Sequence, residues 1–282
     1  MKVRRPHVAN AFYEGGKTEL QDQIVNCFTH KLGPGKVPNL VHGPKKIIGV
    51  VVPHAGYMYS GPVAAHSYAQ LAADGVPDSI VILGPNHTGL GSGVSIMTKG
   101  EWETPLGTIS IDNILADQIR TTSSIVDEDE TAHLSEHSIE VQLPFLQYLY
   151  GSQIRFVPIC MMMQDLQTCR EIARSIAERT KGKYVVIVAS SDFTHYEPGQ
   201  VAARKDKSAI DAILQIDSHK LNGLGEDGHV TMCGYGPITV LMELARLKES
   251  AQPTLLAYHN SGDITNDPSS VVGYAAILFA RS

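Results

Sequence analysis

Short runs of β-branched and other apolar residues alternate along the chain with longer segments whose apolar residues recur at helical spacing. This alternation is typical of crossover units built on a mainly parallel sheet. The apolar runs predict strands over residues 47–52, 80–83, 94–97, 154–158, 184–189, 254–259 and 271–279. The periodic segments predict helices over residues 17–31, 62–73, 111–121, 136–150, 166–180, 201–215 and 237–250. The predicted fold class is therefore α/β, a mainly parallel sheet flanked by helices.

One polar segment rich in glycine and proline, residues 32–45, is long enough to be a linker. It lies too close to the start of the chain to separate two domains, and the sequence shows neither internal repeats nor low-complexity segments. Because α/β proteins of roughly 250 residues commonly form around one sheet, a chain of 282 residues is compatible with one domain. We predict a single domain over residues 1–282.

Composition and charge exclude several classes of protein. Apolar residues make up 43% of the chain and charged residues 18%, which excludes disorder, collagen and coiled coil. The net charge of −6 offers no basic surface for nucleic acid. The charged fraction of 18% also lies below the usual ~25%, which favours a subunit interface and hence a homo-oligomer.

Two further absences bear on location. The apolar stretches are about half as long as the roughly 20 residues that a membrane helix needs. Lys2, Arg4 and Arg5 resemble the charged start of a signal peptide, but the residues that follow contain no apolar core. We therefore expect a cytoplasmic protein that does not span a membrane.

Histidines follow four of the predicted strands at similar positions. His54, His87, His195 and His259 each lie in a polar loop directly after an apolar run, and Asp192 shares the loop of His195. In an open parallel sheet, functional groups collect beyond the carboxyl ends of the strands, where neighbouring loops meet. A single such histidine is more often a structural loop residue, but the repetition favours a shared site.

A second polar cluster stands before the apolar segment that ends near residue 150. Ser135 could cap a helix there, and the spacing of His133, His137 and Glu140 would put them on neighbouring turns. One interpretation is a ligand cluster. The other is that a charged first turn complements the helix dipole.

The four cysteines differ in their surroundings. Cys233 lies in a glycine-rich turn before a helix expected to begin near Pro237, where helical N–H groups and histidines would lower the pKa of a thiol. Cys27, Cys160 and Cys169 lie in apolar-periodic stretches and are expected to be packing residues. No CxxC pair occurs, which argues against a disulfide framework and a structural zinc site.

Two kinds of chemistry suit these residues. His54, His87 and Cys233 could provide three fixed ligands of an open metal site. Alternatively, Cys233 could be the nucleophile of an acyl transfer, with a histidine as base and Asp192 orienting it. Spacing alone does not separate these two. The absence of GxxxxGK[ST] and GxGxxG motifs argues against phosphate chemistry of those types.

Several runs of the sequence resemble the Memo family, in the same order along the chain. They are residues 9–13, 52–61, 83–87, 104–107, 136–140, 190–195 and the turn around Cys233. The resemblance covers essentially the whole chain. It implies a one-domain α/β fold similar to that of the class III extradiol dioxygenases, which hold non-haem iron with two histidines and a glutamate.

The family's site residues match His54, His87, Asp192, His195 and Cys233. The two first histidines would correspond to the dioxygenase ligands, whereas the third ligand position looks like Cys233 in place of a carboxylate. A thiolate is softer than a carboxylate, so it shifts the preference toward copper(I), zinc or thiolate-ligated iron and counts against ring-cleaving oxygenation. Members of the family are associated with iron or copper binding and redox function, and the animal member with phosphotyrosine peptides.

We therefore expect a cytoplasmic oxidoreductase-like protein that binds iron(II) or copper(I), with zinc as a third choice, through His54, His87 and Cys233. Asp192 and His195 would be acid/base groups beside the metal, and His137 and Glu140 would support the pocket from the helix. One alternative is a module that binds a peptide or a small anion in the same crevice without turnover. Another is a cysteine-dependent hydrolase.

Overall fold

The computed structural model describes residues 2–248 and 251–281. Its centre is formed by three strands that are buried at every position: β2 (Ile47–Val52), β3 (Ser79–Pro85) and β9 (Val185–Ser190). Such continuous apolar runs are typical of parallel strands covered on both faces. β9 pairs in parallel with both β2 and β3, so the three strands run side by side in one direction.

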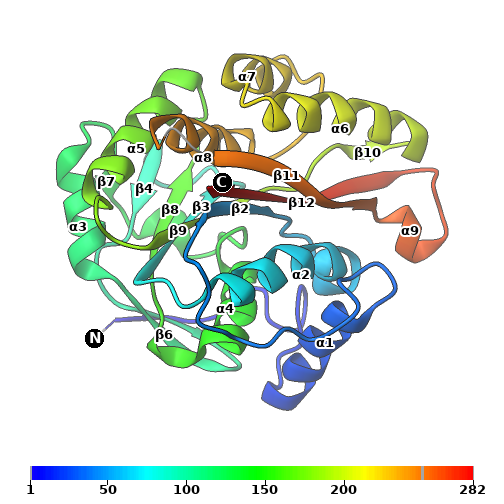
Figure 1. Ribbon diagram of the computed structural model, residues 1–282, viewed down its shortest axis with the longest axis horizontal. Coiled ribbons are helices and arrows are strands. Elements are labelled where there is room, and N and C mark those ends of the chain that lie inside the picture. Colours follow the sequence, from blue (N-terminus) through cyan, green and yellow to red (C-terminus); the bar gives the residue numbers. More distant parts are fainter. Residues whose placement is uncertain (1, 249–250, 282) are drawn as a thin grey trace.

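These strands belong to one twelve-stranded sheet, in which nine strands follow the order β1-β5-β6-β8-β3-β9-β2-β12-β10 (Figure 1). Off this path, β11 pairs with β12, and β4 pairs with β7 and β8. β8 (Arg155–Met161) extends the parallel centre beside β3, whereas β12 (Val271–Arg281) lies antiparallel to β2 and to its other neighbour β11 (Ala251–Asn260). The shorter strands are β1 (Val3–Arg4), β4 (Val94–Ile96), β5 (Glu101–Thr104), β6 (Gly107–Ile111), β7 (Asp127–Glu128) and β10 (His195–Glu197). The predicted mainly parallel α/β sheet is thus confirmed.

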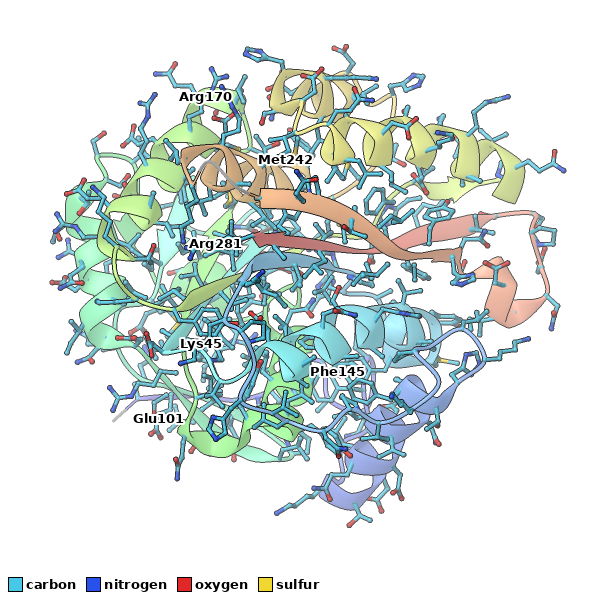
Figure 2. All side chains as sticks on the ribbon, viewed as in Figure 1. Lys45, Glu101, Phe145, Arg170, Met242 and Arg281 are labelled. Atoms are coloured by element: carbon cyan, nitrogen blue, oxygen red, sulfur yellow. The ribbon has the colours of Figure 1, made fainter. Side chains whose placement is uncertain are left out.

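Helices cover both faces of the sheet. One face carries α1 (Lys17–Thr29), α2 (Tyr57–Asp74) and α4 (Leu143–Tyr150), and the other carries α5 (Leu166–Arg179), α6 (Gly199–Leu214), α7 (Ser218–Glu226) and α8 (Tyr235–Leu247). Figure 2 shows Met242 of α8 and Phe145 of α4 on opposite sides of the sheet, and both side chains are buried. The remaining helices are α3 (Asn113–Thr122), α9 (Gly262–Thr265) and the 3₁₀ turns η1 (Thr131–His133), η2 (Glu140–Gln142) and η3 (Gly151–Gln153). Within the described ranges, no helix combines the length and the apolar character needed to cross a membrane.

Every predicted strand and helix overlaps an observed one, but two helix starts are wrong. The helix expected over residues 62–73 begins earlier, at Tyr57. The helix expected over residues 136–150 begins only at Leu143, after the 3₁₀ turn η2, and Ser135 caps nothing there. The preceding segment is held away from helical geometry because Glu136 accepts the backbone N–H of Ser138, and the Ser138 hydroxyl donates to the Pro85 carbonyl. The helix expected over 237–250 is α8, and its last two predicted positions lie outside the described residues.

Polar residues follow the carboxyl ends of the parallel strands and therefore lie at one edge of the sheet. His54, His87 and Asp192 each stand two residues beyond the end of β2, β3 and β9, respectively. Because these strands are parallel neighbours, their carboxyl ends lie together. This arrangement explains how positions far apart in the sequence come to share one site.

Candidate metal centre

His54 is a buried imidazole whose tautomer is set by its neighbours. Its Nδ1 lies 2.8 Å from the Ser190 hydroxyl, which donates its own hydrogen to the Ser138 carbonyl at 2.7 Å and also accepts the Gln142 amide at 2.8 Å. Nδ1 of His54 must therefore carry the proton, because Ser190 has no second hydrogen to give. Burial, followed by the neighbouring histidines, lowers the pKa of His54 well below its usual range. Its Nε2 is left with a free lone pair, which points toward Cys233.

His87 is oriented in the same way by a carboxylate. Its Nδ1 lies 2.9 Å from Oε1 of Glu136, and its backbone N–H donates to Oε2 of the same residue. Burial alone would raise the pKa of Glu136, but the hydrogen bonds from His87 and the N–H of Ser138 lower it to about 2. The ionised carboxylate fixes the proton on Nδ1, so Nε2 of His87 is the nitrogen available to a ligand.

Cys233 lies in the loop just before α8, with Sγ 3.1 Å from Nε2 of His54 and 3.3 Å from the backbone N–H of Asp192. Burial and the Asp192 carboxylate raise the pKa of the Cys233 thiol above its usual range. The expectation of a lowered pKa is therefore wrong. The N–H groups that were expected to stabilise a thiolate are engaged elsewhere, since those of Gly234 and Gly236 donate to the Ser191 hydroxyl and the Gln164 side chain.

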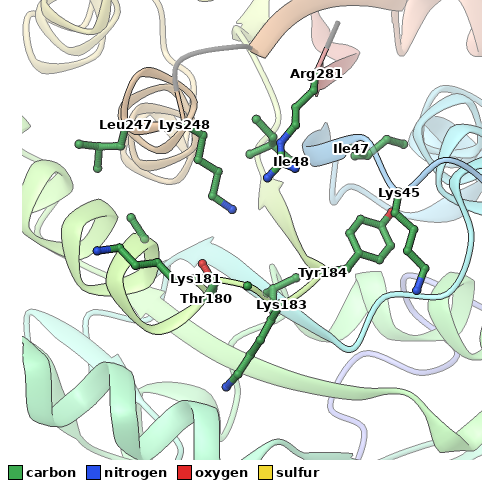
Figure 3. A pocket seen from close by; sticks show the side chains of 13 residues that line it. Lys45, Ile47, Ile48, Thr180, Lys181, Lys183, Tyr184, Leu247, Lys248 and Arg281 are labelled. Carbon is green, nitrogen blue, oxygen red and sulfur yellow. The ribbon is translucent and has the colours of Figure 1, made fainter.

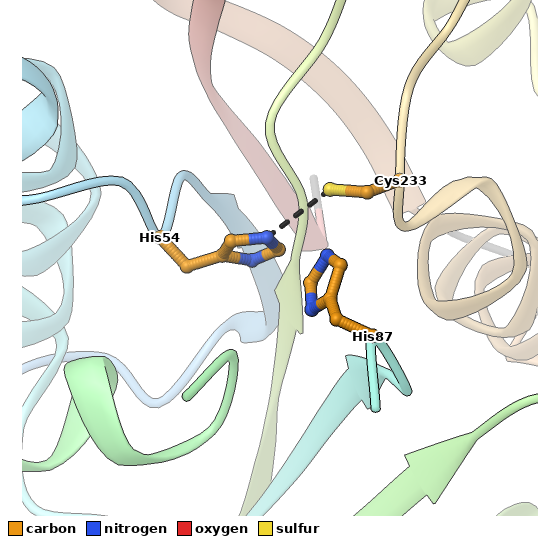
Figure 4. Close-up of side chains that lie close together, drawn as sticks. All are labelled: His54, His87 and Cys233. Atoms are coloured by element: carbon orange, nitrogen blue, oxygen red, sulfur yellow. Dashed lines mark hydrogen bonds between the residues drawn. The ribbon is translucent and has the colours of Figure 1, made fainter. Parts of the chain in front are cut away.

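The expected convergence of His54, His87 and Cys233 is confirmed. Their potential ligand atoms all lie within 4.8 Å of one another, although 179 positions separate His54 from Cys233 (Figure 4). Bonds of about 2.0–2.3 Å from nitrogen and sulfur to an ion would span these gaps after small side-chain shifts. Three fixed ligands with an open side are typical of reactive rather than structural metal sites. The donor set therefore fits a transition metal.

A second group, His87, Glu136 and His137, also has ligand atoms within 4.8 Å of one another. Here the carboxylate is already bonded to Nδ1 of His87 and to the N–H of Ser138. A metal in this place would have to break the bond that orients His87. The group that includes Cys233 is thus the better ligand set, and Glu136 acts on it through His87.

A pocket of about 690 Å³ opens onto the two histidines of this ligand set, whereas Cys233 is not among the residues that line it. His54, His87, His137, Asp192 and His195 line it, together with the rings of Phe12, Tyr59, Tyr196 and Tyr274. The ring of His137 stacks on that of His87 with centroids 4.7 Å apart, and burial lowers the pKa of His137 to about 4. His137 is therefore a neutral wall of the pocket at neutral pH.

Asp192 and His195 complete the polar part of the pocket. Burial raises the pKa of Asp192 to about 6, although its carboxylate accepts the backbone N–H groups of His54 and Ala55. Nδ1 of His195 lies 2.8 Å from the Thr231 carbonyl, which can only accept, so the proton of this imidazole belongs on Nδ1. Its Nε2 is then free to accept a proton.

The structure places three of the singled-out residues away from this pocket. The Glu140 carboxylate is buried against Arg4 at 2.6 Å and the Tyr13 hydroxyl at 2.7 Å, where it anchors the start of the chain. His133 is fully buried against Trp102, so the expected helical cluster of His133, His137 and Glu140 does not form. His259 is part of β11 and lies near Asp263 instead of lining the pocket.

Sequence reasoning missed the residues that orient the histidines. Ser190 is the last residue of β9, and although it begins the Memo-like run 190–195, nothing in that run marks it as a partner of His54. Glu136 lies between His133 and His137, but its distance from His87 in the sequence gives no hint of their pairing. Of the aromatic residues that line the pocket, Phe12 and Tyr59 fall in Memo-like runs, whereas Tyr196 and Tyr274 follow no motif.

Comparison with known proteins gives matches over nearly the whole chain. A family model described as Memo-like protein matches residues 4–278. A MEMO1 family protein of Methanopyrus kandleri is 49% identical over 280 residues, which cover 99% of both chains. One of Methanothermobacter thermautotrophicus is 49% identical over 275 residues, covering 97% of this chain and 99% of that protein.

A solved structure shares the fold. It is that of an uncharacterized protein of Escherichia coli K12, with a TM-score of 0.57 and 15% sequence identity. The match covers 83% of this chain and 99% of the other.

Proposed function

The chain belongs to the Memo family, and we propose that it holds a transition-metal ion between His54, His87 and Cys233 and acts in redox chemistry. The observation that carries the proposal is the convergence of two imidazole nitrogens and one thiol. Ser190 and Glu136 orient the two imidazoles through contacts with their Nδ1 atoms. A mixed nitrogen and sulfur ligand set suits copper(I), thiolate-ligated iron and zinc. Iron(II) or copper(I) would support redox chemistry, which zinc cannot.

A bound iron or copper ion, held by His54, His87 and Cys233, would supply electron transfer. The chain's own residues would handle protons there. Asp192, whose pKa is about 6, can exchange a proton near neutral pH, and the free Nε2 of His195 can accept one. His137 would keep the wall beside His87 neutral.

A cysteine-dependent hydrolase is the second candidate, because Sγ of Cys233 lies 3.1 Å from Nε2 of His54. Such a pair needs a thiolate beside a protonated imidazole. Burial opposes both charges, since it raises the pKa of Cys233 and lowers that of His54. A metal cation compensates this burial by holding the thiolate and the neutral imidazole together. The lowered pKa of His54 therefore suits a metal ligand, whereas the pKa values of both residues oppose the ion pair that a hydrolase needs.

A binding module without turnover is the third candidate, supported by the aromatic rings of the 690 Å³ pocket. A small molecule or a peptide side chain could lie against Phe12, Tyr59 and Tyr274. We propose a cytoplasmic location for any of these functions, supported by the four free cysteines.

The metal content of the protein, purified under reducing and anaerobic conditions, tests the proposal. We expect one iron or copper per chain, or a rise in melting temperature when Fe(II), Cu(I) or Zn(II) is added. Cys233 should be alkylated slowly in the loaded protein and faster after chelation, because the metal shields its sulfur. Equal alkylation rates together with an acyl-enzyme burst would favour the hydrolase, and neither metal nor burst would favour the binding module.

Replacing Glu136 by Gln tests how His87 is oriented. The amide cannot act as an ionised acceptor toward both Nδ1 and the backbone N–H of His87, so the ring loses its fixed tautomer. We expect metal affinity to fall by about 10–100-fold with the three ligands intact. Competition with a chelator of known affinity measures the change. Exposed Glu178, changed to Gln, is the control and should bind metal like the wild type; equal affinities for both variants would contradict the role given to Glu136.

A further inference from the structure

A second pocket lies at the opposite edge of the sheet from the metal centre. It is formed where β2 and β9 begin and where α5 and α8 end, and its volume is about 570 Å³. Five cationic side chains line it, and no acidic residue of the described ranges does. The five are Lys45, Lys181, Lys183, Lys248 and Arg281 (Figure 3).

Two of these cations face the middle of the pocket. Figure 3 shows the ammonium of Lys248 and the guanidinium of Arg281 directed toward the same space. The pKa of Lys248 is lowered by burial and by the charge of Arg281, as expected for like charges at short range. The three other lysines lie around the rim, where their exposed side chains can turn inward.

The rest of the lining is apolar and aromatic. Ile47 and Ile48 are buried at the base, and the ring of Tyr184 lies beside them. Lys45 lies over this ring, 5.5 Å from its centroid. The pocket therefore combines a charged side with a surface suited to the carbon skeleton or ring of a ligand.

Helix dipoles do not account for this gathering of charge. Cations are favoured at helix ends, and both α5 and α8 end here, but each end carries only about half a negative charge. Apart from Lys248, which has an interaction of its own, four cations line the pocket. The four remaining cations still exceed the two helix ends by about three charges. This local excess occurs in a chain whose net charge is −6.

In a neighbouring group of arginines, the positive charge is balanced by a carboxylate of the same chain. Arg170 and Arg246 lie 3.5 Å and 3.0 Å from the carboxylate of Glu243, which offsets their charge. In the part of the chain that the structure describes, none of Lys45, Lys181, Lys183 and Arg281 lies within 4.0 Å of a carboxylate. The charge of these four side chains is therefore left for a ligand to balance.

We propose that this pocket binds a phosphorylated small molecule. Its phosphate groups would lie beside Arg281, within reach of the three rim lysines, and its carbon part would pack on Tyr184 and the isoleucines. Arginine and lysine together are suited to multiply charged phosphates. A volume of about 570 Å³ is in the range of small-molecule sites. The concave shape and the negative net charge disfavour nucleic acid.

Calorimetric titration with ADP, pyrophosphate, inorganic phosphate and adenosine tests the proposal on the full chain. We expect ADP and pyrophosphate to bind more tightly than phosphate, and adenosine to bind weakly or not at all, because the charged side dominates. The affinity for ADP should fall as salt is raised, since these cations are partly exposed. Absence of ADP and pyrophosphate binding at low salt would overturn the proposal.

Matched variants locate the site. Arg281→Gln should weaken ADP binding by about tenfold or more, because a charge-assisted bond to phosphate is lost. The double variant Lys181→Gln/Lys183→Gln should weaken it as well, at positions exposed enough to leave folding unchanged. Arg174→Gln, an equally exposed arginine beside Glu243, is the control and should bind ADP like the wild type. ADP binding that is unchanged in both pocket variants would place the anion elsewhere and refute the inference.

Discussion

The Cys233→Ser variant is expected to lose at least about hundredfold in metal affinity while keeping its fold. Changing a group that merely orients a ligand already costs about 10–100-fold, and Cys233 would contribute the ligand itself. Serine keeps the size of the side chain and sits in a loop before α8, so packing changes little. Chelator competition measures the affinity, and circular dichroism with the melting temperature of the metal-free protein measures the fold.

Cys27→Ser is the matched control for this variant. Cys27 is buried in α1 and is not among the residues that line the pocket, and burial raises the pKa of its thiol to about 12. It should bind metal like the wild type. If Cys233→Ser also binds metal with wild-type affinity, sulfur is not a ligand and the His87, Glu136 and His137 group becomes the better candidate.

Acid should destabilise the protein strongly through His133. This side chain is fully buried, and burial followed by the charge of Arg4 lowers its pKa to about 4, against a smaller opposing effect of the Ser95 backbone. Between pH 6.5 and 4 the unfolded chain takes up a proton here that the folded chain does not. The free energy of unfolding therefore falls as the pH falls through this window, by about 3 kcal/mol from this residue alone.

Urea unfolding of the wild type and of His133→Leu between pH 7 and pH 4 isolates this contribution. Leucine has no group to titrate and is apolar like the surroundings of this buried ring, so the variant should lose about 3 kcal/mol less over the same range. Exposed His42, changed to Gln, should leave the pH dependence of the wild type unchanged. Parallel pH profiles for the wild type and His133→Leu would contradict this origin of acid sensitivity.

The central strands and the loops that follow them could be predicted because short apolar runs in the sequence are enough to identify these strands. Continuous apolar runs mark β2, β3 and β9, and parallel pairing then brings His54, His87 and Asp192 to one edge without knowledge of side-chain contacts. The short strands β5 and β6 were missed because they carry no strong apolar run and form a tight hairpin around Gly107, whose φ is 118°. Such a turn depends on the glycine more than on periodicity.

The errors at the site arose from long-range contacts. The helix expected at residue 136 begins later because Glu136 turns toward His87, a pairing across 49 positions that no spacing reveals. Likewise, the thiol of Cys233 was expected to be acidic from its place before a helix, but the N–H groups there are taken by Ser191 and Gln164. In this chain, the sequence predicted which residues lie in one site, but it did not predict the pKa of Cys233 within that site.

Anaerobic titration with Co(II), followed by absorption spectroscopy, tests the central claim most directly. Cobalt bound by a thiolate gives a sulfur-to-metal charge-transfer band in the near ultraviolet, so the spectrum reports Cys233 as a ligand and not merely as a neighbour. We expect this band to saturate at one equivalent per chain in the wild type, to persist in Cys27→Ser, and to disappear in Cys233→Ser. No band in the wild type, or an unchanged band in Cys233→Ser, would contradict a metal held by His54, His87 and Cys233.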